Sequence, residues 1–127
     1  MYKKEGVRPF FGANSYIIPF LIDPETALLE NRVAIELKKH FGDEVYFYNK
    51  NVEVDFYVPQ HDWLIQVAYS IANDDTRERE ISSLLKVAKH RQAKRLTIIT
   101  YNEEQTISLD NGSTIEVIPL RKWLLES

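Results

Sequence analysis

The sequence predicts one α/β domain in which helices cover both faces of a mixed β-sheet. Three observations support this prediction. The 127 residues suffice for one hydrophobic core, two segments have helical periodicity, and three short alternating segments lie between them. A β-branched run follows the second helical segment. A three-strand meander followed by a helix and a further strand is typical of a mixed sheet between helices.

Residues 1–22 are expected to form an N-terminal arm or linker, in which the apolar run Ser15–Ile22 could form a short strand. The domain itself is expected to span residues 23–127. Its first helix begins after Asp23, because the aspartate side chain can cap the first turn. The helix is expected to end before Gly42, a residue type that commonly terminates helices.

The three strands are expected at Val45–Asn49, Val52–Val58 and Trp63–Ser70, separated by short polar turns. A second helix is expected from Asp75, which has capping-box spacing to Glu78, to about Arg91. The remaining elements are a buried strand, a hairpin around Asp110-Asn111-Gly112 and a short helix: Leu96–Thr100, Thr106–Leu109 with Thr114–Ile118, and Leu120–Leu125.

Composition excludes several functions. The net charge of −3 gives no general attraction for nucleic acid or anionic membranes, so any polyanion site must be local. The chain has no cysteine, which excludes disulfides and thiolate chemistry and fits a cytoplasmic protein. No apolar run approaches the roughly 18 residues of a membrane span. The four glycines cannot form a nucleotide-binding phosphate loop. We therefore expect neither membrane association nor an ATPase motif in this chain.

One carboxylate lies on the face of the first helix that is expected to be buried. Val33, Ala34 and Leu37 share this face at about 100° per residue, and Glu30 falls in its middle. A buried carboxylate is unfavourable unless it is paired, hydrogen-bonded or bound to a cation. Glu30 is therefore either a paired structural residue or a functional one. Glu36 lies off this face and is expected in solvent.

More polar residues lie on the second and third predicted strands. Glu53 and Asp55 alternate with apolar residues along Val52–Val58, so they are expected to share one face. Gln66 and Ala68 share a face of the next strand, and the expected hairpin register makes Asp55 and Gln66 neighbours. An amphipathic strand would explain the alternation, but aspartate is disfavoured inside strands. The pattern indicates a metal site or the remainder of one.

Several motifs together resemble one protein family. In order they are LLENRVAIELKKHFGDEVYFY, VEVDFYV, LIQVAYSI, DDTREREISSLLKVA, LTIIT and IEVIPLRKWLL. They resemble the C-terminal domain of unknown function that follows the ATPase module in a group of bacterial and archaeal AAA-type ATPases. A helix glutamate, a strand aspartate and a next-strand [E/Q]-x-K are also the layout of the PD-(D/E)xK nuclease superfamily. The resemblance implies a three-layer α/β/α, restriction-endonuclease-like core and an ATPase module as a partner within a larger prokaryotic protein.

The same resemblance implies roles by position. Glu30, Asp55 and Gln66 match the positions that bind Mg²⁺ and catalyse phosphodiester hydrolysis, whereas Ala68 stands where the superfamily has its lysine. Gln66 keeps an oxygen ligand without negative charge, so Mg²⁺ binding is expected to be weak. Loss of one electrostatic stabiliser such as the lysine costs on the order of 10²–10³ in rate. Lys50, in the turn before the Asp55 strand, could replace it.

Two further charged groups are candidates. Basic residues crowd the end of the second predicted helix and the following loop: Lys86, Lys89, Arg91, Lys94 and Arg95. They could bind nucleic-acid phosphates, or they could be a solvated helix end whose cations complement the helix dipole. Glu53, Arg77 and Glu80 are expected to border the pocket between Glu30 and Asp55. A surface set of ion pairs is the alternative for Arg77 and Glu80.

Three functions follow, in order of preference. The first is a catalytically weakened or inactive nucleic-acid-binding or regulatory module of an AAA-type ATPase. The second is an active Mg²⁺-dependent nuclease that uses Glu30, Asp55 and Gln66. The third is a protein-interaction domain without a nucleic-acid role, which the acidic net charge permits.

Overall fold

The computed structural model describes residues 6–10 and 23–126. In chain order, the helices and strands are β1 Val7–Pro9, α1 Pro24–Phe41, β2 Tyr46–Lys50, β3 Val52–Val58, β4 Trp63–Val67, α2 Asp74–Arg91, β5 Arg95–Thr100, β6 Gln105–Ser108, β7 Thr114–Pro119 and α3 Leu120–Glu126. None of the helices in this described part has the length and apolar character that a membrane span requires.

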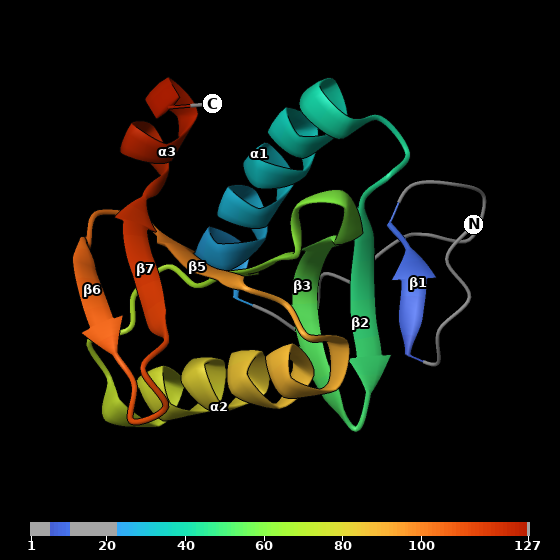
Figure 1. Cartoon of the computed structure of the whole chain (residues 1–127). Helices are drawn as coiled ribbons and strands as arrows, with labels where there is room; N and C mark the ends of the chain where they lie inside the picture. The colour runs from blue at the N-terminus through green and yellow to red at the C-terminus, as the bar shows by residue number, and fades with distance from the viewer. Residues whose placement is uncertain (1–5, 11–22, 127) are drawn as a thin grey trace.

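The seven strands form one mixed sheet in the order β1-β2-β3-β4-β5-β7-β6. The strands β1 to β4 pair antiparallel, β5 pairs parallel with both β4 and β7, and β6 pairs antiparallel with β7. α2 covers one face of the sheet, while α1 and α3 lie beside each other on the other (Figure 1). The predicted three-layer α/β/α order of helix, three-strand meander, helix and strand is confirmed.

The sheet is packed on both faces, so two hydrophobic cores hold it. Under α2, Leu84 and Val87 pack with the inward side chains of β3, β4 and β5. Under α1, Val33 and Leu37 pack with the opposite side chains of the same strands, and Trp123 of α3 completes this core. Full burial of one such aliphatic side chain contributes about 1.5–3 kcal/mol. The strand ends at the centre of the sheet are therefore held firmly in place.

The helix boundaries follow from their capping residues, with one correction. Asp23 caps α1 as predicted, because its Oδ1 accepts the N–H of Thr26 at 2.8 Å. The predicted cap of α2 at Asp75 is wrong. Asn73 is the cap, and its Oδ1 accepts N–H groups at 2.8 and 3.2 Å from the first turn of the helix. Asp75 instead lies within that turn, where its charge complements the helix dipole.

Two strand boundaries also differ from expectation. β4 ends at Val67 instead of Ser70; its last pair with β3 joins Ile65 to Phe56, although the N–H of Ala68 still donates to Ile99 of β5. Within the N-terminal residues expected to be an arm, Val7–Pro9 form an edge strand that pairs with β2. The expected short strand at Ser15–Ile22 lies outside the described residues.

Glu36 of α1 does not lie in solvent as predicted. It is 8% exposed, and its Oε2 lies 2.9 Å from Nε2 of His40, one turn along the helix. The Nζ of Lys39 lies 3.9 Å from the other carboxylate oxygen. These two side chains cover Glu36 and supply the polar partners that allow its burial.

Candidate functional site

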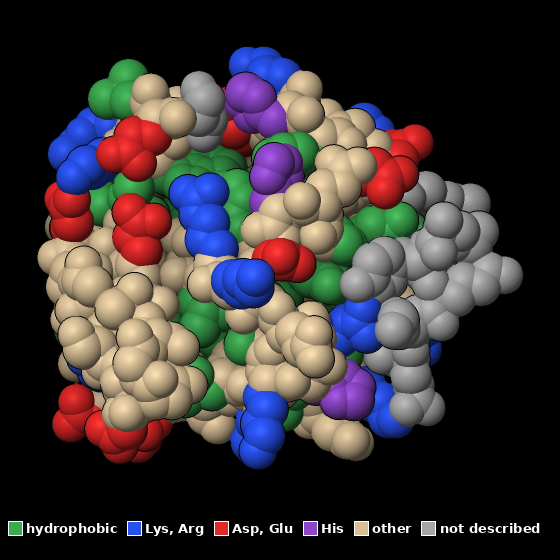
Figure 2. All heavy atoms as spheres, in the orientation of Figure 1, with side chains coloured by type: hydrophobic (Ala, Val, Ile, Leu, Met, Phe, Trp, Pro, Cys, Tyr) green, Lys and Arg blue, Asp and Glu red, His purple; other side chains and the backbone are tan. Residues whose placement is uncertain are grey.

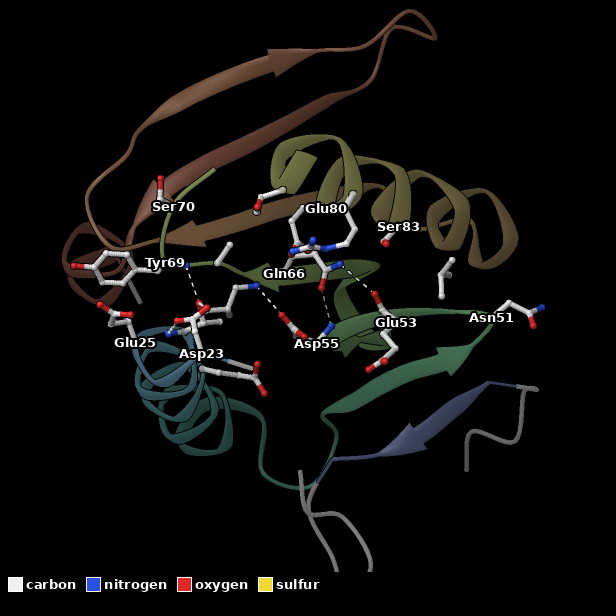
Figure 3. Close-up of a pocket in the computed structure, with 17 residues that line it drawn as sticks. Asp23, Glu25, Asn51, Glu53, Asp55, Gln66, Tyr69, Ser70, Glu80 and Ser83 are labelled. Carbon is white, nitrogen blue, oxygen red and sulfur yellow. Dashed lines mark hydrogen bonds and ion pairs between the residues drawn. The ribbon is translucent and has the colours of Figure 1, made fainter. Parts of the chain in front are cut away.

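A cavity of about 820 Å³ opens where β3 and β4 separate, between the start of α1 and the first half of α2 (Figure 3). Six carboxyl groups line it. Glu25 and Glu30 belong to α1, Glu53 and Asp55 to β3, and Glu80 to α2, while Asp23 is the residue that caps α1. Arg79 of α2 brings one guanidinium to the same wall. The sequence-predicted residues Glu30, Asp55 and Gln66 therefore do meet at one cavity, together with Glu53 and Glu80.

An irregularity in β3 sets the position of Asp55. Tyr46 pairs with Tyr57, but Tyr48 pairs with Val54, so β3 has one residue more than β2 over this stretch. As a result, Val54 packs under α2 whereas Phe56 packs under α1. The prediction that Val54 and Phe56 share a face is wrong for this reason. Asp55 occupies the bulged stretch, and bulges commonly redirect a side chain beside a functional site.

Beyond the last backbone pair of β3 and β4, hydrogen bonds from side chains hold the two strands together. The N–H of Asp55 donates to Oε1 of Gln66 at 2.9 Å, and Nε2 of Gln66 donates to the carbonyl of Glu53 at 3.1 Å (Figure 3). The N–H of Val67 donates to Oδ2 of Asp55 at 2.8 Å. The predicted proximity of Asp55 and Gln66 is confirmed. Both polar atoms of the buried Gln66 amide are thus engaged by the β3 backbone.

Three of the cavity carboxyl groups, those of Glu30, Asp55 and Glu80, have raised pKa values. Burial, followed by the charges of Glu53 and Glu80, raises the pKa of Glu30 from 4.5 to about 7. Burial and the charge of Glu30 raise the pKa of Asp55 well above its usual range, against the effect of the Val67 hydrogen bond. Burial also raises the pKa of Glu80, and the charge of neighbouring Arg79 opposes that rise. Like charges and desolvation both favour neutral carboxyl groups here.

The donor types at the cavity suit Mg²⁺, but, among the described residues, three carboxylates do not come together there. Carboxylate oxygens are the ligands that Mg²⁺ prefers. Within residues 6–10 and 23–126, however, no three Asp, Glu, His or Cys side chains form a group that could hold a metal ion. One oxygen of Asp55 and the oxygen of Gln66 already accept backbone N–H groups. Mg²⁺ binding at Glu30, Asp55 and Gln66 stays a prediction.

The position where the resemblance predicts a lysine carries no charge. Ala68 is 5% exposed and packs in the core under α2. Lys50 is not among the residues that line the cavity, whereas Arg79 is. The Nη2 of Arg79 lies 3.6 Å from Oε2 of Glu80. Arg79 is therefore the nearest analogue of the missing cation that the cavity wall offers.

The structure places Arg77 elsewhere. Its Nη1 donates to Oε1 of Gln105 on β6 at 3.4 Å, and Arg77 does not line the cavity. A sequence signal for Arg79 existed, because Thr76, Arg79, Glu80 and Ser83 follow the i, i+3, i+4, i+7 spacing of one helix face. All four line the cavity.

The basic residues at the end of α2 divide into two kinds. Arg91 lies over the Tyr57 ring at 5.6 Å from its centroid, and Arg95 lies over the Trp63 ring at 3.8 Å. Lys86, Lys89 and Lys94 are exposed, as is Arg95, whereas Arg91 is half-buried. None of the five lines the cavity. On the face that Figure 2 shows, basic side chains form small separate groups with acidic ones between them.

Comparison with known proteins assigns a family. Residues 25–123 match the model of DUF4143, a domain of unknown function. The chain belongs to the DUF4143 family. The matched segment contains every cavity carboxylate except Asp23. The prediction of a domain of unknown function is thus confirmed.

One curated relative shows that DUF4143 can be part of a longer protein. The uncharacterized protein MJ1544 of Methanocaldococcus jannaschii is 39% identical over 108 residues, which are 77% of this chain and 24% of that protein. The chain thus spans about a quarter of the length of the relative it matches. No solved structure matches the chain.

Proposed function

We propose that this DUF4143 domain is a catalytically weakened or inactive member of the PD-(D/E)xK superfamily, serving as a nucleic-acid-binding or regulatory module of a larger AAA-type ATPase. One observation carries the proposal: both polar atoms of the Gln66 amide bind the backbone of β3. The element order and the meeting of Glu30 with Asp55 at one cavity support the superfamily assignment. The relative's greater length supports a larger parent protein.

The hydrogen bonds of Gln66 explain why catalysis would be weak. One lone pair of Oε1 already accepts the Asp55 N–H, and turning the amide toward a metal would break this bond and the bond from Nε2 to the Glu53 carbonyl. Each unsatisfied buried group costs about 1–3 kcal/mol. The lysine position is filled by buried Ala68, so it offers no charge to the transition state. Gln66 links β3 to β4, and Ala68 is neutral where the lysine is expected. Both features suit a structural role better than a catalytic one.

Nucleic-acid binding is proposed for Lys86, Lys89 and Lys94. Arg91 and Arg95 lie on aromatic rings, although Arg95 is also exposed, and these three lysines are exposed at one end of α2 and in the loop that follows. Exposed ammonium groups can contact phosphates and release the counterions condensed on nucleic acid. Such binding would weaken steeply as salt concentration rises.

The test compares two triple variants that lose the same charge. Lys86→Gln/Lys89→Gln/Lys94→Gln is expected to bind single- or double-stranded DNA or RNA more weakly and to lower the salt slope by about 2–3. The control Lys38→Gln/Lys39→Gln/Lys122→Gln removes three exposed lysines from α1 and α3 and is expected to behave like wild type. Equal losses in both variants would refute a local site at the end of α2.

An active Mg²⁺-dependent nuclease is the second candidate, favoured by the guanidinium of Arg79 on the cavity wall. Its test is titration of Mg²⁺ and Mn²⁺ into wild type and Asp55→Ala, followed by incubation with DNA and RNA. Metal binding and cleavage that both disappear in Asp55→Ala would establish the nuclease. Intact substrate at millimolar metal would support the weakened site.

A further inference from the structure

Two tyrosines form a stacked pair at the surface beside the cavity. Tyr69 follows the end of β4, Tyr101 follows the end of β5, and their ring centroids lie 5.0 Å apart with planes inclined by 12°. The residues are 37% and 53% exposed, and Tyr69 also lines the cavity. Exposed tyrosines beside a concave site are common anchors for binding partners.

Hydrogen bonds hold this pair in place. The N–H of Tyr101 donates to the carbonyl of Tyr69 at 3.1 Å, and the N–H of Tyr69 donates to Oγ1 of Thr26 at 3.2 Å. Thr26 is itself bonded to the carboxylate of Asp23 through both its N–H and its hydroxyl. The backbone of the pair is therefore anchored to the start of α1, which lowers the entropy that binding must cost.

The charges beside the pair favour a cationic ligand. Exposed Asp23 and Glu25 lie next to Tyr69 (Figure 3). Six carboxyl groups and one guanidinium line the whole cavity, and burial makes the carboxyl groups of Glu30, Asp55 and Glu80 harder to ionise by raising their pKa. A phosphate group would meet repulsion at this edge, whereas a cation would be attracted. An aromatic face next to a carboxylate is the combination that arginine uses best, because its planar guanidinium stacks on rings and pairs with carboxylates.

We propose that the Tyr69–Tyr101 edge of the cavity binds an arginine-containing basic segment of a partner protein. The guanidinium lies on a tyrosine face and pairs with Glu25, and a neighbouring cation of the same segment pairs with Asp23. This binding requires neither metal nor catalysis, so it is independent of the proposed nuclease-fold function.

The test measures fluorescence anisotropy of a labelled peptide in which three arginines alternate with glycines, titrated with the 127-residue chain. The arginine peptide is expected to bind, and its citrulline counterpart, which is uncharged, is expected not to bind. Tyr101→Ala should weaken binding about fivefold and Glu25→Gln about threefold, as expected for one exposed cation–π contact and one ion pair. Leu125→Ala, which removes another exposed apolar side chain from α3, should leave binding unchanged.

A fold-preserving control and an alternative ligand make the test decisive. Urea unfolding of Tyr101→Ala should match wild type, so that lost binding reports the contact. Absence of arginine-peptide binding at millimolar concentration, or equal binding to Tyr101→Ala, would overturn the proposal. So would binding of a ten-thymidine oligonucleotide that Tyr101→Ala abolishes while the peptide fails to bind, because the pair would then be a platform for nucleobases.

Discussion

The two ends of α2 contrast in how their charged residues are accommodated. At its start, Glu80 faces the cavity that holds Glu30 and Asp55, and burial raises the pKa of all three carboxyl groups. At its end, Arg91 lies over the Tyr57 ring, while the nearby lysines are exposed. The cavity charges are desolvated and coupled, whereas the charges at the far end are solvated or stacked.

Because of this contrast, substitutions at the two ends of α2 should have different measurable effects. Desolvated, coupled groups change folding stability and its pH dependence when they are altered. Solvated charges contribute little to stability, and their removal changes mainly long-range attraction for ligands. Substitutions in the cavity should therefore be detected by unfolding experiments, and substitutions of the lysines mainly by binding experiments.

Glu30→Gln is expected to have the largest effect. The folded pKa of Glu30 is about 7 against a usual 4.5, so the folded domain keeps a proton that the unfolded chain has released. Wild-type stability therefore falls as pH rises from 4.5 to about 7. Glutamine removes this dependence, so the variant should be more stable than wild type by up to about 3 kcal/mol above pH 7. Urea unfolding between about pH 5 and about pH 8 measures the difference.

The matched control for this prediction is Glu44→Gln, which alters an exposed glutamate in the loop after α1. Its stability relative to wild type should not change over the same pH range. If the difference between Glu30→Gln and wild type were also constant with pH, the proton assigned to Glu30 would be absent, and the coupling between the cavity carboxylates would be disproved.

Gln66→Ala is expected to have the next largest effect, a destabilisation of about 2 kcal/mol. It leaves the N–H of Asp55 and the carbonyl of Glu53 without their side-chain partner. Gln66→Glu should destabilise more, because a carboxylate cannot donate to the Glu53 carbonyl and adds a like charge beside Asp55. Denaturant unfolding checks both. Gln60→Ala, which alters an exposed glutamine, is the control. If both variants lowered the free energy of unfolding equally, the hydrogen bonds of Gln66 to β3 would contribute nothing to stability.

Much of the fold could be predicted because its signals are local. Strand β3 agrees with the expected Val52–Val58 residue for residue, and α1 ends at Phe41, directly before Gly42, whose φ of 61° suits glycine. Glu30 was detectable because a carboxylate within an apolar helix face is energetically unusual. Asp55 was detectable because aspartate is rare within strands.

Other features depend on contacts between distant segments. The bulge in β3 exists only relative to β2, and strand alternation alone predicts the wrong face for Val54 or Phe56. Tyr69 and Tyr101 become neighbours because β4 and β5 pair in parallel, which aligns the residues after their ends. The hydrogen bonds of Gln66 to β3 also require the final register, so sequence reasoning could propose it as a ligand but could not find its structural role.

Arg95→Ala tests whether the contact of this arginine with an aromatic ring stabilises the fold, unlike the nearby lysines. Arg95 lies 3.8 Å from the centroid of Trp63, so its loss should destabilise the fold by about 1 kcal/mol. Lys89→Ala should change stability by less than about 0.5 kcal/mol, because this lysine is exposed. Thermal and urea unfolding of the two variants measure the difference. Equal effects would mean that the arginine is as solvated as the lysine.

Arg79→Gln is expected to have the smallest effect on stability, and its electrostatic effect should be confined to the neighbouring Glu80. Its side chain is 66% exposed, so the free energy of unfolding should change by less than about 0.5 kcal/mol. Because the charge of Arg79 opposes the rise of the Glu80 pKa, its removal should raise that pKa further. An NMR titration of the Glu80 side-chain carboxyl measures this pKa.

Lys86→Gln is the control. It removes an exposed cation further along α2, and it should leave the Glu80 titration unchanged. Equal shifts in both variants would mean that Glu80 responds to the overall charge of α2, and the cavity and the basic end would then be one electrostatic region instead of two.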